Sequence, residues 1–335
     1  MEKYRAIVAS LNEIKKQLET KIFKYEIIYP DKNICFCKKT VFSGIEIDPR
    51  GLPIYSIVFV YHMKKFLDEG FEPMILFADK HAIEVRRPFV VNANKQQIEN
   101  VKLLWKKLFK TFNVNAQFFE STIVSKDRRY KTIYEIISNT KNKLKYLPKE
   151  IRKYYVDKGY VPECEWNYVN MEVSDVLYFT PGIFFSDLPE RPLHIALHEK
   201  TLQSKRNLKN IGLPFSFLTP TMPPTTKNIP APTFYWLGDF RDLYKGIISL
   251  FDDRKTIKQK VNRIFMDNMK EAIAYIWLFI INKVAEELGF PETLFEEIED
   301  WVTGKVNMDE KNLKERTIKS LIEICEYFTE VLKLA

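Results

Sequence analysis

Tyr168, Glu172 and Asp175 are the residues whose types and spacing most suggest chemistry. They stand four and then three residues apart, so a helix would present all three side chains on one face. A carboxylate can hold an ammonium group through a charge-assisted hydrogen bond, and it can also act as a general base. The spacing alone thus places a phenol and two carboxylates on one face of a predicted helix.

Other chemically suggestive residues have weaker patterns. His194 and His198 have a spacing that can bind zinc, but no third ligand lies nearby in the sequence, so we predict no metal site. Cys35 and Cys37 alternate on a strand-like run and are expected to be buried core thiols. The chain has only ten glycines and contains neither GxxxxGK[ST] nor GxGxxG, which argues against a glycine-rich phosphate-binding loop.

Charge is distributed unevenly along the chain. Residues 101–160 contain 15 lysines and arginines against five acidic residues, whereas residues 286–335 contain six against 13. A basic segment with interleaved aromatic residues can bind a polyanion such as RNA. The alternative is a solvated helical surface whose aromatic residues turn into the core. The RNA-binding candidates in this segment are Lys141, Lys143, Lys145, Arg152 and Lys153.

The composition is that of a folded globular protein. Of the 335 residues, 46% are hydrophobic and 29% are charged, with a formal net charge of +8, which excludes disordered and fibrous chains. The longest apolar run, residues 272–282, is too short to span a bilayer core of about 30 Å. We see no signal-peptide pattern and, with four cysteines, no disulfide framework. We therefore expect a soluble, cytoplasmic protein that does not contact membranes.

The elements that would position the candidate residues alternate between strands and helices. This order predicts a βαβ unit and a doubly wound parallel sheet. Six prolines between residues 214 and 232 predict a long ordered loop, because proline disfavours helices and central strands. From residue 254 onward the pattern is helical, with breaks at 289–291 and 304. The expected strands are 41–47 and 73–79, and the expected earlier helices are 3–20, 57–69 (ended by Gly70) and 95–111.

Three segments, in this order, resemble the tyrosyl- and tryptophanyl-tRNA synthetases, the subgroup of class I aminoacyl-tRNA synthetases for aromatic amino acids. They are 48–82 (DPRG, a helix, GF and ILFADKHA), 168–199 and 249–264 (SLFDDRKTIKQKVNRI). The resemblance covers most of the chain from about 40 to 330. It implies a Rossmann-like domain over 1–245, with a basic helical insertion at about 85–160, and a C-terminal all-α domain over 246–335.

The resemblance also implies a pocket for an aromatic amino acid. Carried over position by position, its residues are His81, Tyr168, Glu172, Asp175 and Glu190, with Tyr168 and Glu172 as the catalytic candidates. The family has glutamines where this chain has Glu172 and Glu190, and the change favours a cationic ligand group or creates a general base. The alternative is that these two glutamates only form ion pairs with Arg191 or with surface lysines.

The two ATP signatures of the family are degenerate here. The His-x-Gly-His signature reads Ile54-Tyr55-Ser56-Ile57, and of the Lys-Met-Ser-Lys-Ser loop little more than Met222 and Lys227 remains, within MPPTTKN. Loss of a single donor to a developing charge can cost roughly 10²–10³-fold in rate. We therefore expect no amino-acid adenylation in the manner of the family. ATP and Mg²⁺ are expected as cofactors only if the chain is a ligase after all.

The resemblance leaves four functions open. The favoured one is a synthetase-like paralogue that binds an aromatic amino-acid-like ligand, tRNA or both. The second is an active tyrosine or tryptophan ligase with a divergent ATP site. The third is a transferase similar to the cyclodipeptide synthases, which consume aminoacyl-tRNA, although their Gly-x-Ser motif reads Gly44-Ile45-Glu46 here. The fourth is a non-catalytic interaction protein, because the family dimerises through the region equivalent to 85–160, and we expect a homodimer.

Overall fold

The computed structural model describes residues 24–28, 39–49, 51–84, 92–139, 163–179, 181, 183–185, 216–221, 248–266, 273, 276–302 and 304–334. The helix predicted over 3–20 lies outside these ranges.

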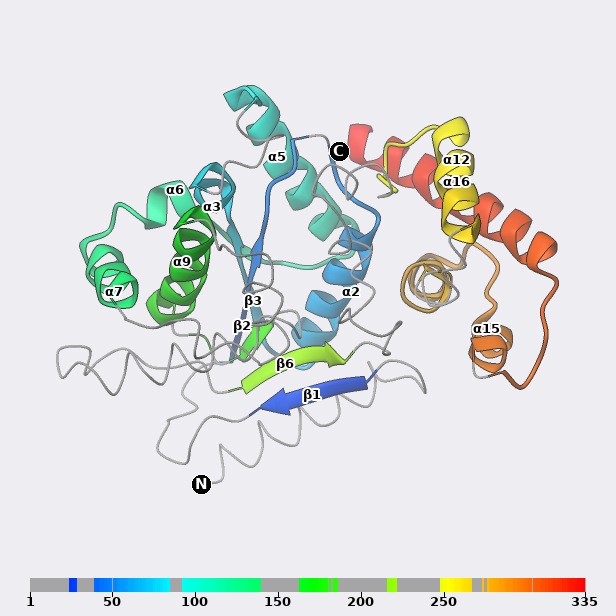
Figure 1. Ribbon diagram of the computed structural model, residues 1–335, viewed down its shortest axis with the longest axis horizontal. Helices are drawn as coiled ribbons and strands as arrows, with labels where there is room; N and C mark the ends of the chain where they lie inside the picture. The colour runs from blue at the N-terminus through cyan, green and yellow to red at the C-terminus, as the bar shows by residue number, and fades with distance from the viewer. Residues whose placement is uncertain are drawn as a thin grey trace.

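A six-stranded sheet forms the centre of the molecule (Figure 1). Its strands lie in the order β1-β6-β5-β2-β3-β4, in which β1 is antiparallel to β6 and all other neighbours are parallel. The chain runs from β2 outward to β3 and β4 and then continues on the other side of β2 with β5 and β6. This is the doubly wound, Rossmann-like sheet predicted from the sequence, and the strand order reverses between β2 and β5. The strands are β1 (Lys24–Ile28), β2 (Thr40–Ile45), β3 (Glu72–Phe77), β4 (Gln117–Glu120), β5 (Ile183–Phe185) and β6 (Ser216–Thr221).

Helices cover both faces of the sheet, which explains why β3 is apolar on both faces from Pro73 to Phe77. One face packs against α2 (Tyr55–Asp68) and α5 (Lys95–Thr111). The other face packs against α6 (Ser121–Val124), α7 (Arg128–Ser138) and α9 (Glu163–Phe179). The strands predicted over 41–47 and 73–79 and the helices predicted over 57–69 and 95–111 are confirmed within two residues at each end.

Local signals set the ends of two of these helices. Gly70 follows α2 with a φ of 81°, which glycine adopts without strain. α5 begins with a capping box, in which the side chains of Asn94 and Gln97 each accept a hydrogen bond from the other residue's backbone N–H. α5 is the crossover helix between β3 and β4, so residues 95–120, which lie inside the predicted insertion, include the edge strand of the sheet.

The proline-rich stretch contains a strand, so the prediction of a loop throughout 214–232 is wrong for 216–221. β6 lies between β1 and β5, and Ser216, Phe217 and Leu218 are the residues that pair with β5. Pro220 lies beyond them, opposite Tyr25 of β1. Its missing N–H therefore removes no bond on the β5 side, which is why a proline is tolerated in an inner strand here.

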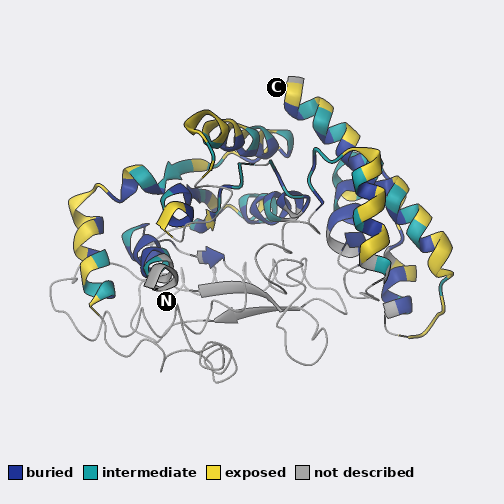
Figure 2. Cartoon of the chain, turned by 45° about the horizontal axis from the view of Figure 1, so that its top comes forward, coloured by how far each residue is buried: buried dark blue, intermediate teal, exposed yellow. Residues whose placement is uncertain are grey.

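The C-terminal part is helical, as predicted, and its helices share one hydrophobic core with α2 and α5 (Figures 1 and 2). The ring of Phe112, at the C-terminal end of α5, stacks on Phe328 with centroids 6.0 Å apart. Lys107 Nζ donates a hydrogen bond to Leu332 O at 3.0 Å. The elements are α12 (Arg254–Met266), the π-helical turn η3 (Ile276–Ile281), α14 (Asn282–Leu288), α15 (Phe295–Val302) and α16 (Glu310–Leu334).

Within the described ranges, none of the helices combines the length and the apolar character that a membrane crossing requires.

Candidate functional site

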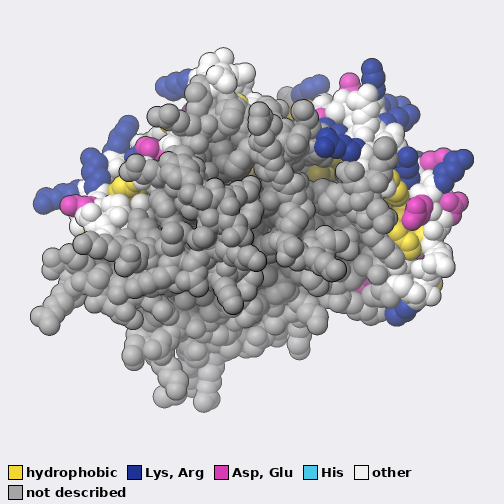
Figure 3. All heavy atoms as spheres, in the orientation of Figure 1, with side chains coloured by type: hydrophobic (Ala, Val, Ile, Leu, Met, Phe, Trp, Pro, Cys, Tyr) yellow, Lys and Arg dark blue, Asp and Glu magenta, His cyan; other side chains and the backbone are white. Residues whose placement is uncertain are grey.

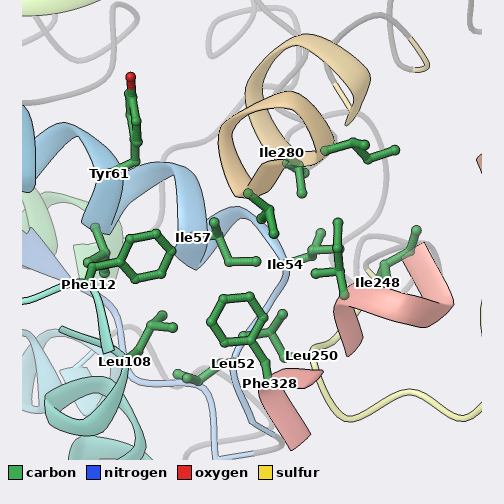
Figure 4. Packing of buried hydrophobic residues seen from close by; sticks show 14 of the residues in the cluster. Leu52, Ile54, Ile57, Tyr61, Leu108, Phe112, Ile248, Leu250, Ile280 and Phe328 are labelled. Atoms are coloured by element: carbon green, nitrogen blue, oxygen red, sulfur yellow. The ribbon is translucent and has the colours of Figure 1, made fainter. Parts of the chain in front are cut away.

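The first turn of α2, where the first ATP signature would lie, is buried among apolar side chains. Ile54 is 4% exposed, and Ser56 and Ile57 are each 0% exposed. Figure 4 shows Ile54 and Ile57 among aliphatic and aromatic side chains from distant parts of the chain, including Ile248, Leu250, Ile280 and Phe328. The two positions that would carry imidazoles therefore belong to the hydrophobic core.

Backbone hydrogen bonds fasten this turn to residues 248–250. The N–H of Ile54 donates to Ile248 O at 2.8 Å, and the N–H of Leu250 donates to Leu52 O at 2.8 Å. Pro53 and Ser249 form an antiparallel bridge between these bonds. We call residues 52–54 and 248–250 the clasp. The side chain of Tyr55, together with Met222 and Lys227, lies outside the described residues.

The second region of interest is the carboxyl edge of β2, and the packing of α9 determines which residues meet there. α9 is followed closely by β5, which is parallel to β2, so α9 runs from the carboxyl edge of the sheet to its amino edge. Phe179 near the end of α9 stacks on Phe42 of β2 with centroids 4.9 Å apart. This contact fixes the position of the helix along the strand.

The positions of Asp175 and Gly44 can be estimated from the contact between Phe179 and Phe42. Asp175 lies about 6 Å before Phe179 along the helix axis, and Gly44 lies about 7 Å beyond Phe42 along the strand, on the same face. By this count Asp175 lies on the side of Phe179 that is nearer the carboxyl edge, at about the level of Gly44. Gly44 is exposed although its neighbours on both sides are buried, and a Cβ added to it would meet nothing within 4 Å.

Asp175 forms a buried pair with His81. His81 Nε2 lies 2.8 Å from Asp175 Oδ2, and the two side chains are 1% and 5% exposed. Burial alone would lower the pKa of His81, but the charge and hydrogen bond of Asp175, helped by Glu172, outweigh it and raise the pKa. By contrast, burial and the charge of Lys283 lower the pKa of His62 to about 3. The Asp175 carboxylate therefore favours the charged imidazole.

The Asp175 carboxylate also lies beside Tyr130 of α7. The hydroxyl of Tyr130 donates to Met171 O at 3.3 Å. Burial, together with the charge of Asp175 and a hydrogen bond to it, raises the pKa of this phenol. Tyr130 thus links α7 to the buried His81–Asp175 pair.

A buried network holds the helix that carries His81, α3 (Asp79–Glu84). Asp79 accepts hydrogen bonds from Lys102 Nζ at 2.9 Å and from Ser121 Oγ at 2.8 Å. Lys102 also donates to Glu120 at 2.7 Å. Burial opposes the charge on Asp79, but the bonds from Lys102 and Ser121 prevail and lower its pKa. The network links α3 to α5 and to the end of β4, and so positions His81.

The structure thus brings three of the five predicted pocket residues, His81, Glu172 and Asp175, to one place. The backbone of Tyr168 lies one helical turn before Glu172, but its side chain is outside the described part, as is all of Glu190. Glu46, two residues beyond Gly44, was not predicted as a site residue. A glycine in an apolar strand pattern is the signal that could have found this edge.

No group of three or more His, Cys, Asp or Glu residues within the described ranges is arranged to hold a metal ion.

The basic surface is described only in part, because the predicted RNA-binding candidates at 141–153 lie outside the described residues. The start of α7 and the turn before it carry exposed cations, and Figure 3 shows Lys and Arg side chains gathered at that end of the molecule. These residues are Lys126, Arg128, Arg129 and Lys131.

No family model matches the sequence, and no curated protein matches it. Solved structures do match. Tyrosyl-tRNA synthetase from Archaeoglobus fulgidus, complexed with L-tyrosine, is 16% identical and has a TM-score of 0.63 over 88% of this chain and 90% of that chain. Tryptophanyl-tRNA synthetase from the hyperthermophilic archaeon Aeropyrum pernix K1 is 12% identical, with a TM-score of 0.59 over 88% and 78%. The chain therefore has the fold of these class I synthetases, as the sequence resemblance predicted.

Proposed function

We propose that this chain, which has the fold of tyrosyl- and tryptophanyl-tRNA synthetases, binds an aromatic amino-acid-like ligand, tRNA or both, without forming an aminoacyl adenylate. The observation that carries the proposal is the burial of Ile54, Ser56 and Ile57 in the core, at the positions that correspond to the first ATP signature.

Adenylation needs donors and cations placed beforehand around the reacting phosphorus. Isoleucine side chains supply neither, and the backbone N–H of Ile54 is already bonded to Ile248 O. A nucleotide at this turn would have to displace buried isoleucines, and exposing one such side chain costs about 1.5–3 kcal/mol. The lack of donors and cations at this turn, and the cost of exposing its isoleucines, argue against an active ligase.

A serine-based transfer like that of the cyclodipeptide synthases is also disfavoured. The position of the serine in the Gly-x-Ser motif is Glu46. Ser43 is 5% exposed and, because alternate strand residues point to opposite faces, it lies on the other side of the sheet from Gly44. No serine of β2 therefore supports a covalent intermediate over the carboxyl edge.

The ligand part of the proposal is supported by the retained His81–Asp175 pair and by the open face of Gly44. Exposed cations on α7 support tRNA as a partner. Three exposed apolar side chains on neighbouring elements support a homodimer: Ile83 at 48%, Leu103 at 52% and Ile123 at 62% exposure. A cytoplasmic location belongs to the same proposal.

The experiment is ATP–pyrophosphate exchange with each of the twenty amino acids, run beside calorimetry with tyrosine, tryptophan and their derivatives. We expect no exchange, and binding that the substitution Gly44→Val removes without lowering the Tm, because a side chain at this exposed position fills only ligand space. Exchange with any amino acid would establish the ligase instead. Unchanged binding by Gly44→Val would show that the ligand lies elsewhere.

A further inference from the structure

α12 is a two-faced helix whose outer face is basic. Ile257 and Val261 are 1% and 0% exposed and pack into the hydrophobic core. The exposed residues lie on the other side of the helix and include four cations, whereas α12 contains no acidic residue. We call these exposed residues the α12 face: Arg254, Lys255, Lys258, Gln259, Asn262 and Arg263.

The α12 face is a basic strip beside acidic helices. Residues 286–335, which follow α12, contain six lysines and arginines against 13 acidic residues. Figure 3 shows several Lys and Arg side chains at the upper right of the molecule, where Figure 1 places α12 and α16. α7 lies at the opposite end of the molecule in Figure 1. The α12 face is therefore separate from the exposed cations of α7.

Helix stability does not explain the cations at the start of α12. The N-terminus of a helix carries a partial positive charge, which disfavours lysine and arginine there. Nevertheless, the first two residues of α12 are Arg254 and Lys255. The first turn is capped without them, because Asp253 Oδ1 accepts a hydrogen bond from the N–H of Thr256 at 2.7 Å.

Ion pairing explains only one of the four cations. Arg254 Nε donates to Glu326 Oε1 at 2.6 Å, and both side chains are exposed, so this pair adds little stability. Within the described ranges, Lys258 and Arg263 form no ion pair. These charges are therefore available to an anionic partner.

We propose that the α12 face binds the sugar–phosphate backbone of an RNA double helix without reading its bases. The inference rests on the proposed function, of which it specifies the RNA-binding surface and the form of the RNA. Two sources share this chemistry: a stem of tRNA, and any other A-form RNA duplex.

The side-chain composition of the α12 face favours a duplex backbone over other partners. The face has no apolar and no aromatic side chain. Protein interfaces have an apolar core, and single-stranded RNA is held by bases that stack on aromatic rings. Lysine, arginine, asparagine and glutamine are the side chains that contact phosphates and sugars, and the α12 face consists of these four types.

The length of the α12 face suits several phosphates. Arg254 and Arg263 are nine residues apart, which corresponds to about 13.5 Å along the helix axis. Because Arg254 is shared with Glu326, we count three phosphate contacts from the remaining cations. Three contacts predict a slope of log K against log salt of about −3.

The test is fluorescence anisotropy of the full chain with labelled RNA at several salt concentrations. The probes are two RNA duplexes of unrelated sequence, a single-stranded RNA of the same length, and unfractionated tRNA. We expect the two duplexes to bind equally, at least tenfold more tightly than the single strand, with a slope of about −3. Tighter binding of tRNA than of the duplexes assigns a tRNA stem, and equal binding assigns any A-form duplex.

Variants then locate the RNA. Lys258→Gln combined with Arg263→Gln should weaken duplex binding about tenfold or more and flatten the slope by about two. Lys311→Gln combined with Lys333→Gln removes two exposed charges from the ends of α16. This matched control should change neither the affinity nor the slope. A urea melt of each variant confirms that it is folded.

Three outcomes would overturn the inference. Duplex binding that is lost in Arg128→Gln with Lys131→Gln, but unchanged in the α12 variant, would move the RNA to α7 and leave the proposed function standing. Poly-L-glutamate or duplex DNA that binds as tightly as duplex RNA would assign the α12 face to acidic proteins or to polyanions in general. Failure of tRNA and of both duplexes to bind would instead count against the RNA part of the proposed function itself.

Discussion

Replacing Asp175 by asparagine tests the buried pair most directly, because the substitution removes the charge and keeps the shape. His81 Nε2 and Asp175 Oδ2 are 2.8 Å apart and almost fully buried. Removing one partner of a buried ion pair typically costs about 3–5 kcal/mol. We expect a value near the lower end, about 3 kcal/mol, since the side-chain amide oxygen of the variant can still accept a hydrogen bond.

The cost should depend on pH, with a sign fixed by the raised pKa of His81. The folded protein holds this proton more tightly than the unfolded chain, whose imidazole titrates near pH 6.5. The stabilisation is therefore complete below about pH 6.5 and is lost as the pH rises through the pKa of the folded state. In Asp175→Asn burial persists without the main opposing charge, so the pKa of His81 should fall below its ordinary value. The difference in free energy of unfolding should thus be larger in acid than in alkali.

The assay combines urea unfolding at pH 5.5 and pH 8.5 with NMR titration of the imidazoles. The chain has four histidines, and His81→Asn identifies the resonance of interest. His62 is the internal control, because burial and Lys283, rather than Asp175, lower its pKa to about 3, so we expect the substitution to leave it unchanged. An unchanged pKa of His81 in Asp175→Asn, or an equal loss of stability at both pH values, would refute the reasoning.

Three further predictions concern the first turn of α2, the buried network and the basic segment. Ile57→Ala should lower the free energy of unfolding by about 2–5 kcal/mol in urea melts, since it leaves a cavity in the core; a loss below about 1 kcal/mol would contradict the packing. Lys102→Met leaves the buried Asp79 without its cation and should cost about 3–5 kcal/mol. Because the pKa of Asp79 is lowered, this loss of stability should shrink as the pH falls through that pKa. A loss that does not depend on pH between 3 and 7 would argue against the Lys102–Asp79 ion pair. Changing Lys141, Lys143 and Lys145 to glutamate should weaken tRNA binding and flatten the slope of log K against log salt by about two to three; an unchanged slope would place the RNA elsewhere.

Much of the fold could be predicted from local sequence. β2, β3, α2 and α5 follow from apolar runs, helical spacing and terminal signals such as Gly70. β6 could not be predicted in this way, because Pro220 resembles a strand breaker until it is known that β5 pairs only with the three residues 216–218.

The candidate site was predictable in part. Glu172 and Asp175 share a helix face that spacing reveals, and the family resemblance assigned His81 to the same predicted pocket. The direct pairing of Asp175 with His81 joins α9 to α3, and no local pattern encodes it. In the same way, the sequence shows that imidazoles are absent at Ile54 and Ile57, but it does not show that residues 248–250 close over them.

The clasp also sets the order in which the native structure can form during synthesis. Residues 52–54 obtain their partners only after residues 248–250 have been made, and closing such a long loop costs conformational entropy that only later contacts repay. Phe112 obtains its stacking partner later still, because Phe328 lies on α16, the last of the described helices to be synthesised. Until the C-terminal helices are made, the part of α2 that packs against η3 and α14 stays exposed, and exposed apolar surface of this kind favours aggregation and chaperone binding. Part of the hydrophobic core whose residues are synthesised early is therefore completed only when α16 has been synthesised.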